Sequence, residues 1–483
     1  MTPVRLAVLL AAVLAAARSA IFVFQPLSHF DSDHAIFGLM AKHLVEGRAF
    51  PLFMYGQTYL LAVESWLAAP LFAVFGPSPL LLKLPLLALN ALAAALLVRG
   101  FIVDVKLPPA SAFAAALPFL LPSVAVAAEF VGPNGGNLEP SVYILLLWLT
   151  RARPVWGGLI LGVGFMHREF TIYGLAALLI VEAADRTLFT RAGITRRGLT
   201  IGAAAAVWGL VQIVRPLSSG AGPGAPVDRL ASNNVLELLA RTCVSPSTAF
   251  TGVERLFTLH WPELLGTARY ALADFGIESV VWQGMSGASW LPAAAVALAI
   301  AGIATHFLRT RLAPPFAVFL VLVGIFSAAG YALGRCGAVS FHGMRYELLS
   351  PLGLAGLFAW FLAGRPPIAL AVAWRVALAG WLLVVAIPHA RLATEYATGA
   401  PVPAKWHLAQ VLESRGVRYG WADYWIAYYV TFVTDERVVL ASSDVERISV
   451  YRLVSERRID AVRLSRQPCE GGIALIPGVY QCP

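Results

Sequence analysis

Charged residues are scarce in this chain. Asp, Glu, Lys and Arg make up 13% of its 483 residues and hydrophobic residues 59%, whereas charged residues are about 25% of a soluble domain. A soluble fold could not cover so much apolar surface, so the excess must face lipid. The scarcity of charge therefore excludes a soluble globular protein and indicates a multi-pass membrane protein.

The net charge of +9 does not indicate nucleic-acid binding. The basic residues do not gather on one compact domain but lie in short clusters between apolar runs. Such clusters are what the positive-inside rule predicts for the cytoplasmic loops of a membrane protein. We therefore expect contact with membrane lipid and none with nucleic acid.

An obvious cleavable signal is also lacking. The first apolar stretch runs from Leu6 to Phe24 behind Arg5 and is long enough to span a membrane. Arg18 interrupts it near the outer end, where a long side chain can reach the interface. We interpret the stretch as an uncleaved first helix, with a signal peptide as the weaker alternative.

Apolar runs long enough for transmembrane helices recur along the chain, since about 20 such residues cross a bilayer. We predict about eleven spans, near 5–25, 80–103, 110–128, 139–150, 154–167, 170–186, 199–217, 289–307, 313–333, 347–363 and 367–388. With the N-terminus inside, every short inner connection carries at least one basic residue, namely Arg99, Lys106, Arg151, Arg153, Arg186, Arg191, Arg196, Arg197, Arg309, Arg311 and Arg365. This agreement predicts the orientation.

The same topology places two long segments outside, roughly 27–79 and 218–288, together with everything after about residue 388. The tail is less apolar and contains strand-like runs at 437–440 and 473–476. We therefore predict an all-α transmembrane domain over 1–388, with outer-face interfacial helices, and a small soluble α/β domain over 389–483.

All four cysteines fall on the predicted outer side, where an oxidising compartment allows disulfides. Cys469 and Cys482 lie close together in the tail and are predicted to be bridged. Such a short loop contributes about 3 kcal/mol in the chain-entropy model. The sequence does not fix the pairing of Cys243 and Cys336, and four free thiols are the alternative.

The first outer loop carries the acids Asp31 and Asp33, followed by an apolar stripe at Ile36, Met40 and Leu44. This spacing predicts an amphipathic helix at the interface with acids at its N-terminal end. A carboxylate there can act as a general base or hold a divalent metal. The alternative is that Asp31 or Ser32 only caps the helix.

Three other short outer segments carry ionisable residues. Glu129 and Glu139 flank a glycine-rich turn, and Glu139 alternatively is only a helix N-terminal charge. His167, Arg168 and Glu169 join two spans, and there a cation could bind phosphate unless Arg168 and Glu169 simply balance each other. Arg345 follows His342 before the tenth span, and it is either a second phosphate ligand or a solvated loop arginine.

The chain resembles the GT-C glycosyltransferases, the broad group of protein mannosyltransferases, the lipid A aminoarabinose transferase and related bacterial envelope transferases. Asp33 corresponds to the first member of the family's acidic pair, and His34 stands where a second acid is common. The other matching segments are 31–35 through 46–47, 51–57, 75–78, 162–167, Arg345-Tyr346 with Pro351, and 419–428.

The resemblance implies an enzyme that transfers a hexosyl or pentosyl group from a polyprenyl-phosphate donor to a glycan, lipid or protein acceptor, usually with inversion. Asp33 would be the base, with Asp31 beside it, and the leaving phosphate would bind Arg168, His167 or Arg345. His34, Glu64, Glu139 and Tyr346 would contact the substrates. No cofactor is certain, although a divalent metal is possible.

The resemblance places the enzyme in a bacterial inner (plasma) membrane, with its active site and C-terminus on the periplasmic or extracellular side. The alternative function is a transporter or flippase of lipid-linked sugars. Transporters place ionisable groups near the middle of the membrane and often contain internal repeats. Here the acids lie at span ends and no repeat is evident, which favours the transferase. The sequence identifies neither the sugar nor the acceptor.

Overall fold

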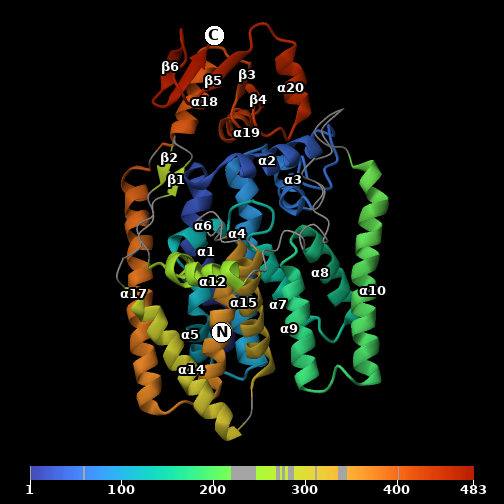
Figure 1. The fold of residues 1–483 in the computed structure, drawn as a ribbon, viewed down its shortest axis with the longest axis vertical. Coiled ribbons are helices and arrows are strands. Elements are labelled where there is room, and N and C mark those ends of the chain that lie inside the picture. Colours follow the sequence, from blue (N-terminus) through green and yellow to red (C-terminus); the bar gives the residue numbers. More distant parts are fainter. Residues whose placement is uncertain are drawn as a thin grey trace.

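The computed structural model describes residues 2–57, 60–218, 246–267, 272–274, 278–280, 288–310, 313–334, 345–400 and 402–483. Over these residues the chain forms a long helical bundle with a small sheet domain at one end (Figure 1). The N-terminus lies in the half of the bundle away from that domain. The predicted all-α membrane protein with a C-terminal α/β domain is confirmed in its fold class.

Each of the eleven predicted spans coincides with a helix of the bundle. These helices are α1 (Pro3–Phe24), α4 (Pro79–Val103), α5 (Pro109–Leu120), α7 (Glu139–Leu149), α8 (Pro154–His167), α9 (Thr171–Ala184), α10 (Arg191–Val214), α14 (Trp290–Thr310), α15 (Pro315–Gly334), α16 (Ser350–Ala363) and α17 (Ile368–Gly399). Seven helices of the described chain are long and apolar enough to cross a membrane, whereas α5, α7, α8 and α9 are shorter.

Two predicted boundaries differ from the structure. The third span was expected to be continuous over 110–128, but α5 ends at Leu120 and the short helix α6 (Val124–Glu129) follows. Pro122 separates them, because the residue before a proline is disfavoured in the helical conformation. The last span passes residue 388 and continues to Gly399, so the expected domain boundary lies inside α17.

The bundle core is formed by apolar side chains of small and aromatic residues. The pairs α1–α4 and α15–α16 are in extensive contact. In the second pair, a Cβ on Gly324 would lie 2.7 Å from the Cα of Gly353, so both positions require glycine for the two backbones to approach. Close approach at small residues is a usual way for membrane helices to pack.

The expectation that Arg18 reaches the membrane interface is wrong. Its side chain is buried in the bundle, where Nη2 donates a hydrogen bond of 2.8 Å to Oδ1 of Asn90 on α4. Its guanidinium also lies 5.1 Å from the centre of the Phe130 ring. A polar partner on the neighbouring helix makes burial of this charge tolerable, which a single-helix argument does not foresee.

An outer layer of short helices covers the end of the bundle nearest the sheet domain (Figure 1). The first of the two segments predicted to lie outside forms η1 (Pro26–His29), α2 (Ser32–Val45) and α3 (Val63–Phe75). The second predicted outer segment follows η2 (Arg215–Leu217) and forms α12 (Pro246–Arg255), η3 (Leu256–His260), α13 (Trp261–Leu264) and the short strands β1 (Leu272–Asp274) and β2 (Glu278–Val280). Most of 218–288, including Cys243, lies outside the described residues.

Helix α2 exists as predicted but is not amphipathic. Residues 34–43 are all buried, because α3 packs on one side of the helix and α19 (Tyr424–Val433) on another. Gly38 allows this approach, since a Cβ there would lie 2.4 Å from the ring of Phe432. The apolar stripe at Ile36 and Met40 therefore packs inside protein.

The C-terminal domain is a five-stranded mixed sheet with helices. Its elements are α18 (Ala404–Ser414), β3 (Tyr419–Ala422), α19, β4 (Val439–Ser442), α20 (Ser449–Glu456), β5 (Val462–Ser465), β6 (Ile473–Ile476) and β7 (Val479–Cys482). The strand order is β4-β3-β5-β7-β6, with β3 parallel to β4 and β5 and the other pairs antiparallel. Cys469 and Cys482 form the expected disulfide. Cys336 lies outside the described residues.

Candidate active site

The acidic turn at the start of α2 divides its two aspartates between different tasks. Asp31 is the N-cap: its Oδ1 accepts from the backbone N–H of His34 at 3.0 Å, and Nδ1 of His34 accepts from the backbone N–H of Asp31 at 3.3 Å. This reciprocal pair is a capping box. The capping alternative therefore applies to Asp31, while Asp33 in the first turn has other partners.

The Asp33 carboxylate faces partners from two distant parts of the chain. The hydroxyl of Tyr424, at the start of α19, donates a short hydrogen bond to Oδ1. Nη1 of Arg345 lies 3.7 Å from Oδ2. The Asp33 side chain remains 17% exposed, so water or a substrate can reach it. Burial and the Asp33 charge together raise the pKa of Tyr424 well above its usual value, which keeps its hydroxyl a donor.

Two guanidinium groups meet at one aromatic ring beside this carboxylate. Arg345 lies 5.3 Å and Arg168 also 5.3 Å from the centre of the Tyr346 ring. Arg168 comes from the turn after α8, so the two cations reach the ring from separate segments. Convergent guanidinium groups, with their fixed planes of N–H donors, are suited to binding phosphate.

Glu129 is a further ionisable group near this acidic turn. Its Oε2 accepts a 2.7 Å hydrogen bond from Asn137, and its Oε1 lies 3.7 Å from Nε2 of His29. Burial raises its pKa to about 7; the Arg345 charge opposes the rise, and Asp31 and Asp33 add to it. A carboxyl with this pKa can exchange a proton at neutral pH.

His34 lies behind the acidic turn. Its side chain is 1% exposed, and its ring packs 5.7 Å from Phe30 and 5.5 Å from His29, centre to centre. Burial, followed by the charge of Lys83, lowers its pKa to about 3, so the ring is neutral at neutral pH. The structure thus places His34 within the protein, where its clearest contact is the capping box.

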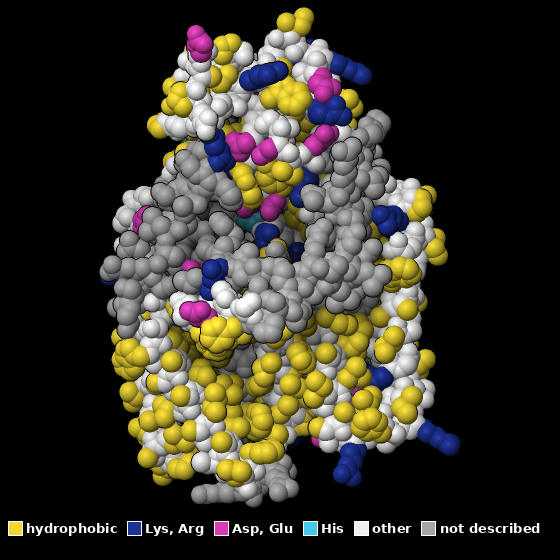
Figure 2. Space-filling view, in the orientation of Figure 1, with side chains coloured by type: hydrophobic (Ala, Val, Ile, Leu, Met, Phe, Trp, Pro, Cys, Tyr) yellow, Lys and Arg dark blue, Asp and Glu magenta, His cyan; other side chains and the backbone are white. Residues whose placement is uncertain are grey.

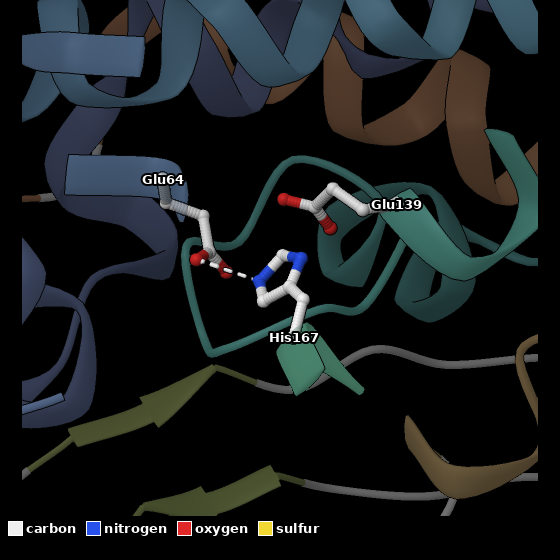
Figure 3. Close-up of side chains that lie close together, drawn as sticks. All are labelled: Glu64, Glu139 and His167. Atoms are coloured by element: carbon white, nitrogen blue, oxygen red, sulfur yellow. Dashed lines mark hydrogen bonds and ion pairs between the residues drawn. The ribbon is translucent and has the colours of Figure 1, made fainter. Parts of the chain in front are cut away.

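A second group of polar side chains, Glu64, Glu139 and His167, is buried where α3, α7 and α8 meet (Figure 3). Nε2 of His167 lies 3.0 Å from Oε2 of Glu64. The backbone N–H of Gly136 donates to the other oxygen of Glu64 at 2.8 Å. Burial opposes ionisation of Glu64, but the charge and hydrogen bond of His167 lower its pKa below the usual value.

The glycine-rich turn before α7 holds the two groups next to each other. Gly135 and Gly136 have φ values of +72° and +90°, which glycine adopts without strain. A Cβ on Gly136 would lie 3.0 Å from Cβ of Arg168, so the turn packs directly on that arginine. Since Arg168 follows His167 in sequence, the buried group and the arginine pair share one short piece of backbone.

The structure therefore gathers most of the predicted site residues into two neighbouring groups. Asp33, Arg168, Arg345 and Tyr346 form one, whereas Glu64, Glu139 and His167 form the other and are buried. Glu129 and Tyr424 also lie at this site, although the sequence alone predicts no role for either; both belong to segments with a predicted functional pattern, the acidic turn at 129–139 and the tail segment 419–428. His342 lies outside the described residues. A hollow below the C-terminal domain exposes acidic, basic and histidine side chains (Figure 2).

Comparison with family models and with curated proteins gave no match. The solved structures that are similar to the chain include two at 12% identity and a TM-score of 0.47 each. The apo oligosaccharyltransferase of Archaeoglobus fulgidus matches 95% of this chain and 69% of its own. ArnT from Cupriavidus metallidurans, bound to undecaprenyl phosphate, matches over 94% and 92%. The likeness is one of general architecture.

Proposed function

We propose that this protein is an integral membrane glycosyltransferase that moves a sugar from a polyprenyl-phosphate donor to an acceptor on the outer face of a bacterial inner membrane. One observation carries the proposal: the guanidinium groups of Arg168 and Arg345 each lie 5.3 Å from the centre of the Tyr346 ring, and Arg345 also lies 3.7 Å from the Asp33 carboxylate. A pair of cations for a leaving phosphate thus lies beside a partly exposed carboxylate.

Each group has a defined part in the proposed reaction. The acceptor oxygen or nitrogen forms a bond to the anomeric carbon while Asp33 takes its proton. The bond between the anomeric carbon and the phosphate oxygen breaks, and the phosphate leaves with the electron pair. Arg168 and Arg345 stabilise that charge, which is where fixed donors act most strongly. Attack opposite the leaving group gives inversion.

The test compares two aspartates that are two residues apart. Asp33→Asn removes the base, and removing a general base typically lowers the rate about 10²–10⁴-fold. Asp31→Asn is the matched control, because asparagine caps a helix as well as aspartate does. Both purified variants would be supplied with polyprenyl-phosphate sugars, and consumption of the donor would be followed together with thermal unfolding.

Near-normal transfer by Asp33→Asn would remove it as the base. Loss of transfer in Glu129→Gln alone would then assign proton transfer to Glu129, whose pKa is about 7. Loss in Arg168→Lys or Arg345→Lys with unchanged folding supports the phosphate role, since lysine keeps the charge but lacks the planar pair of donors.

Transport of lipid-linked sugars is the second candidate. The Arg18–Asn90 pair is the kind of polar contact inside the bundle that a transporter would use. Reconstituted vesicles separate the two functions: a transferase consumes the donor when acceptor is supplied, whereas a flippase moves intact donor between leaflets. Donor movement without consumption would favour the transporter.

A further inference from the structure

The group formed by Glu64, Glu139 and His167 has the composition of a metal site. One ligand atom from each residue lies within 4.8 Å of the other two. Among the described residues, this is the one group of three His, Cys, Asp or Glu side chains close enough to share a metal ion. The three side chains are between 0% and 2% exposed. They come from three different helices, so the chain's folding alone brings them together (Figure 3).

One buried oxygen of this group has no partner. Oε2 of Glu139 accepts from the backbone N–H of Leu138 at 3.1 Å, but Oε1 has no hydrogen-bond partner among the described residues. Its carboxylate is directed toward Glu64 and His167 (Figure 3). A buried acceptor that is left unsatisfied is unfavourable by about the full desolvation of that atom, so the oxygen points to a missing donor or cation.

The group also places two carboxylates beside one imidazole. Two like charges in one buried site disfavour each other's ionisation. The guanidinium of Arg168, the residue after His167, lies instead 5.2 Å from the Phe170 ring centre and 5.3 Å from the Tyr346 ring centre. A divalent cation among the three ligand atoms would allow both carboxylates to be ionised together.

The distances suit such a cation. Ligand atoms about 2.1 Å from a tetrahedral Zn²⁺ are about 3.4 Å from each other, close to the 3.0 Å between His167 and Glu64. Outer contacts already orient two of the ligands, as metal sites require. The hydroxyl of Tyr143 lies 3.0 Å from Nδ1 of His167, and Gly136 donates to Glu64.

We propose that Glu64, Glu139 and His167 bind one divalent transition-metal ion that joins the ends of α3, α7 and α8. An imidazole with two carboxylates favours Zn²⁺ or Mn²⁺ over Mg²⁺ or Ca²⁺, which prefer oxygen ligands alone. The proposal does not rest on the glycosyltransferase activity, because the site is separate from Asp33 and its binding can be measured without substrate.

The test measures metal directly. Full-length protein, purified in detergent without chelator, would be analysed for bound metals by elemental mass spectrometry. It would then be stripped with EDTA and titrated separately with Zn²⁺, Mn²⁺ and Mg²⁺. We expect one equivalent of Zn²⁺ or Mn²⁺ per chain, at least tenfold weaker binding of Mg²⁺, and a melting temperature several degrees higher in the loaded protein than in the stripped protein.

Variants decide whether these residues hold the ion. Glu139→Gln and His167→Gln should each weaken binding at least tenfold. Glu347→Gln is the matched control, because Glu347 and His260 form another buried carboxylate–imidazole pair at 3.2 Å, and it should bind metal as the wild type does. If a variant does not fold, the metal content and melting shift of the unmodified protein still decide. Absence of stoichiometric metal before and after titration, or equal binding in Glu139→Gln, would overturn the proposal.

Discussion

Two buried groups of carboxylate and imidazole in this protein differ in how their charges are balanced. At the junction between α2 and the C-terminal domain, Glu436 is surrounded by cations and donors. Lys42 lies 3.0 Å and His43 3.3 Å from its carboxylate, Tyr451 donates to it at 2.8 Å, and Arg48 is also bonded to it. At the junction of α3, α7 and α8, Glu64 and Glu139 share only His167.

The carboxylate of Glu436 has all its polar partners within the protein, whereas that of Glu139 does not have them among the described residues. Around Glu436 the protein itself supplies every charge that the carboxylate needs, so the group can act as a fixed joint between the first outer segment and the tail. Around Glu139 one oxygen remains without a partner among the described residues. A buried polar network that is only partly satisfied is less stable than an apolar core, so the second group leaves room for a ligand that the described residues do not supply.

The largest effect on stability is expected from Glu436→Gln. The substitution removes the carboxylate that Lys42 and His43 share, while Lys42 keeps its pair with Asp435. Removing one partner of a buried ionic network typically destabilises by about 3 kcal/mol. Thermal unfolding of the full-length protein in detergent measures it. Glu413→Gln is the control, because its partner Arg437 is 68% exposed and exposed pairs contribute about 0–1 kcal/mol. Equal losses in the two variants would contradict the comparison.

The pH dependence of stability should differ between the wild type and Glu436→Gln. Burial alone would raise the pKa of Glu436, but the hydrogen bonds from His43, Arg48 and Lys42 hold it well below its usual value. A carboxyl with a lowered folded pKa stabilises the protein above its unfolded value of about 4.3, and this contribution is lost as the pH falls below it. We expect a steeper loss of stability below pH about 4.5 in the wild type than in Glu436→Gln. Parallel pH profiles would rule out this role.

The smallest effect is expected from Glu139→Gln in protein stripped of metal. Removing one of two like charges relieves their repulsion, so the change should be a gain, or a loss of less than about 1 kcal/mol. The measurement is thermal unfolding in the presence of EDTA, beside Glu436→Gln under the same conditions. A loss as large as that of Glu436→Gln would mean that Glu139 already has its partner in the chain.

The sequence by itself determined the positions and order of the apolar bundle helices, the existence of α2, the tail sheet and the bridged pair Cys469 and Cys482. Each of these depends on a local property. The length of an apolar run sets whether a helix can span, and a short separation sets whether two tail cysteines can meet. For the same reason the sequence identified Asp33 and Arg345 as candidates without showing that they face each other.

Tertiary structure alone decided how the site is assembled. Asp33 and Tyr424 are 391 residues apart and still share a hydrogen bond, because α19 packs on α2. Glu64, Glu139 and His167 converge because three helix ends meet, and Arg18 is buried because Asn90 of a neighbouring helix faces it. Periodicity and hydropathy record which face of one element is apolar, but they carry no information about which distant element will cover it.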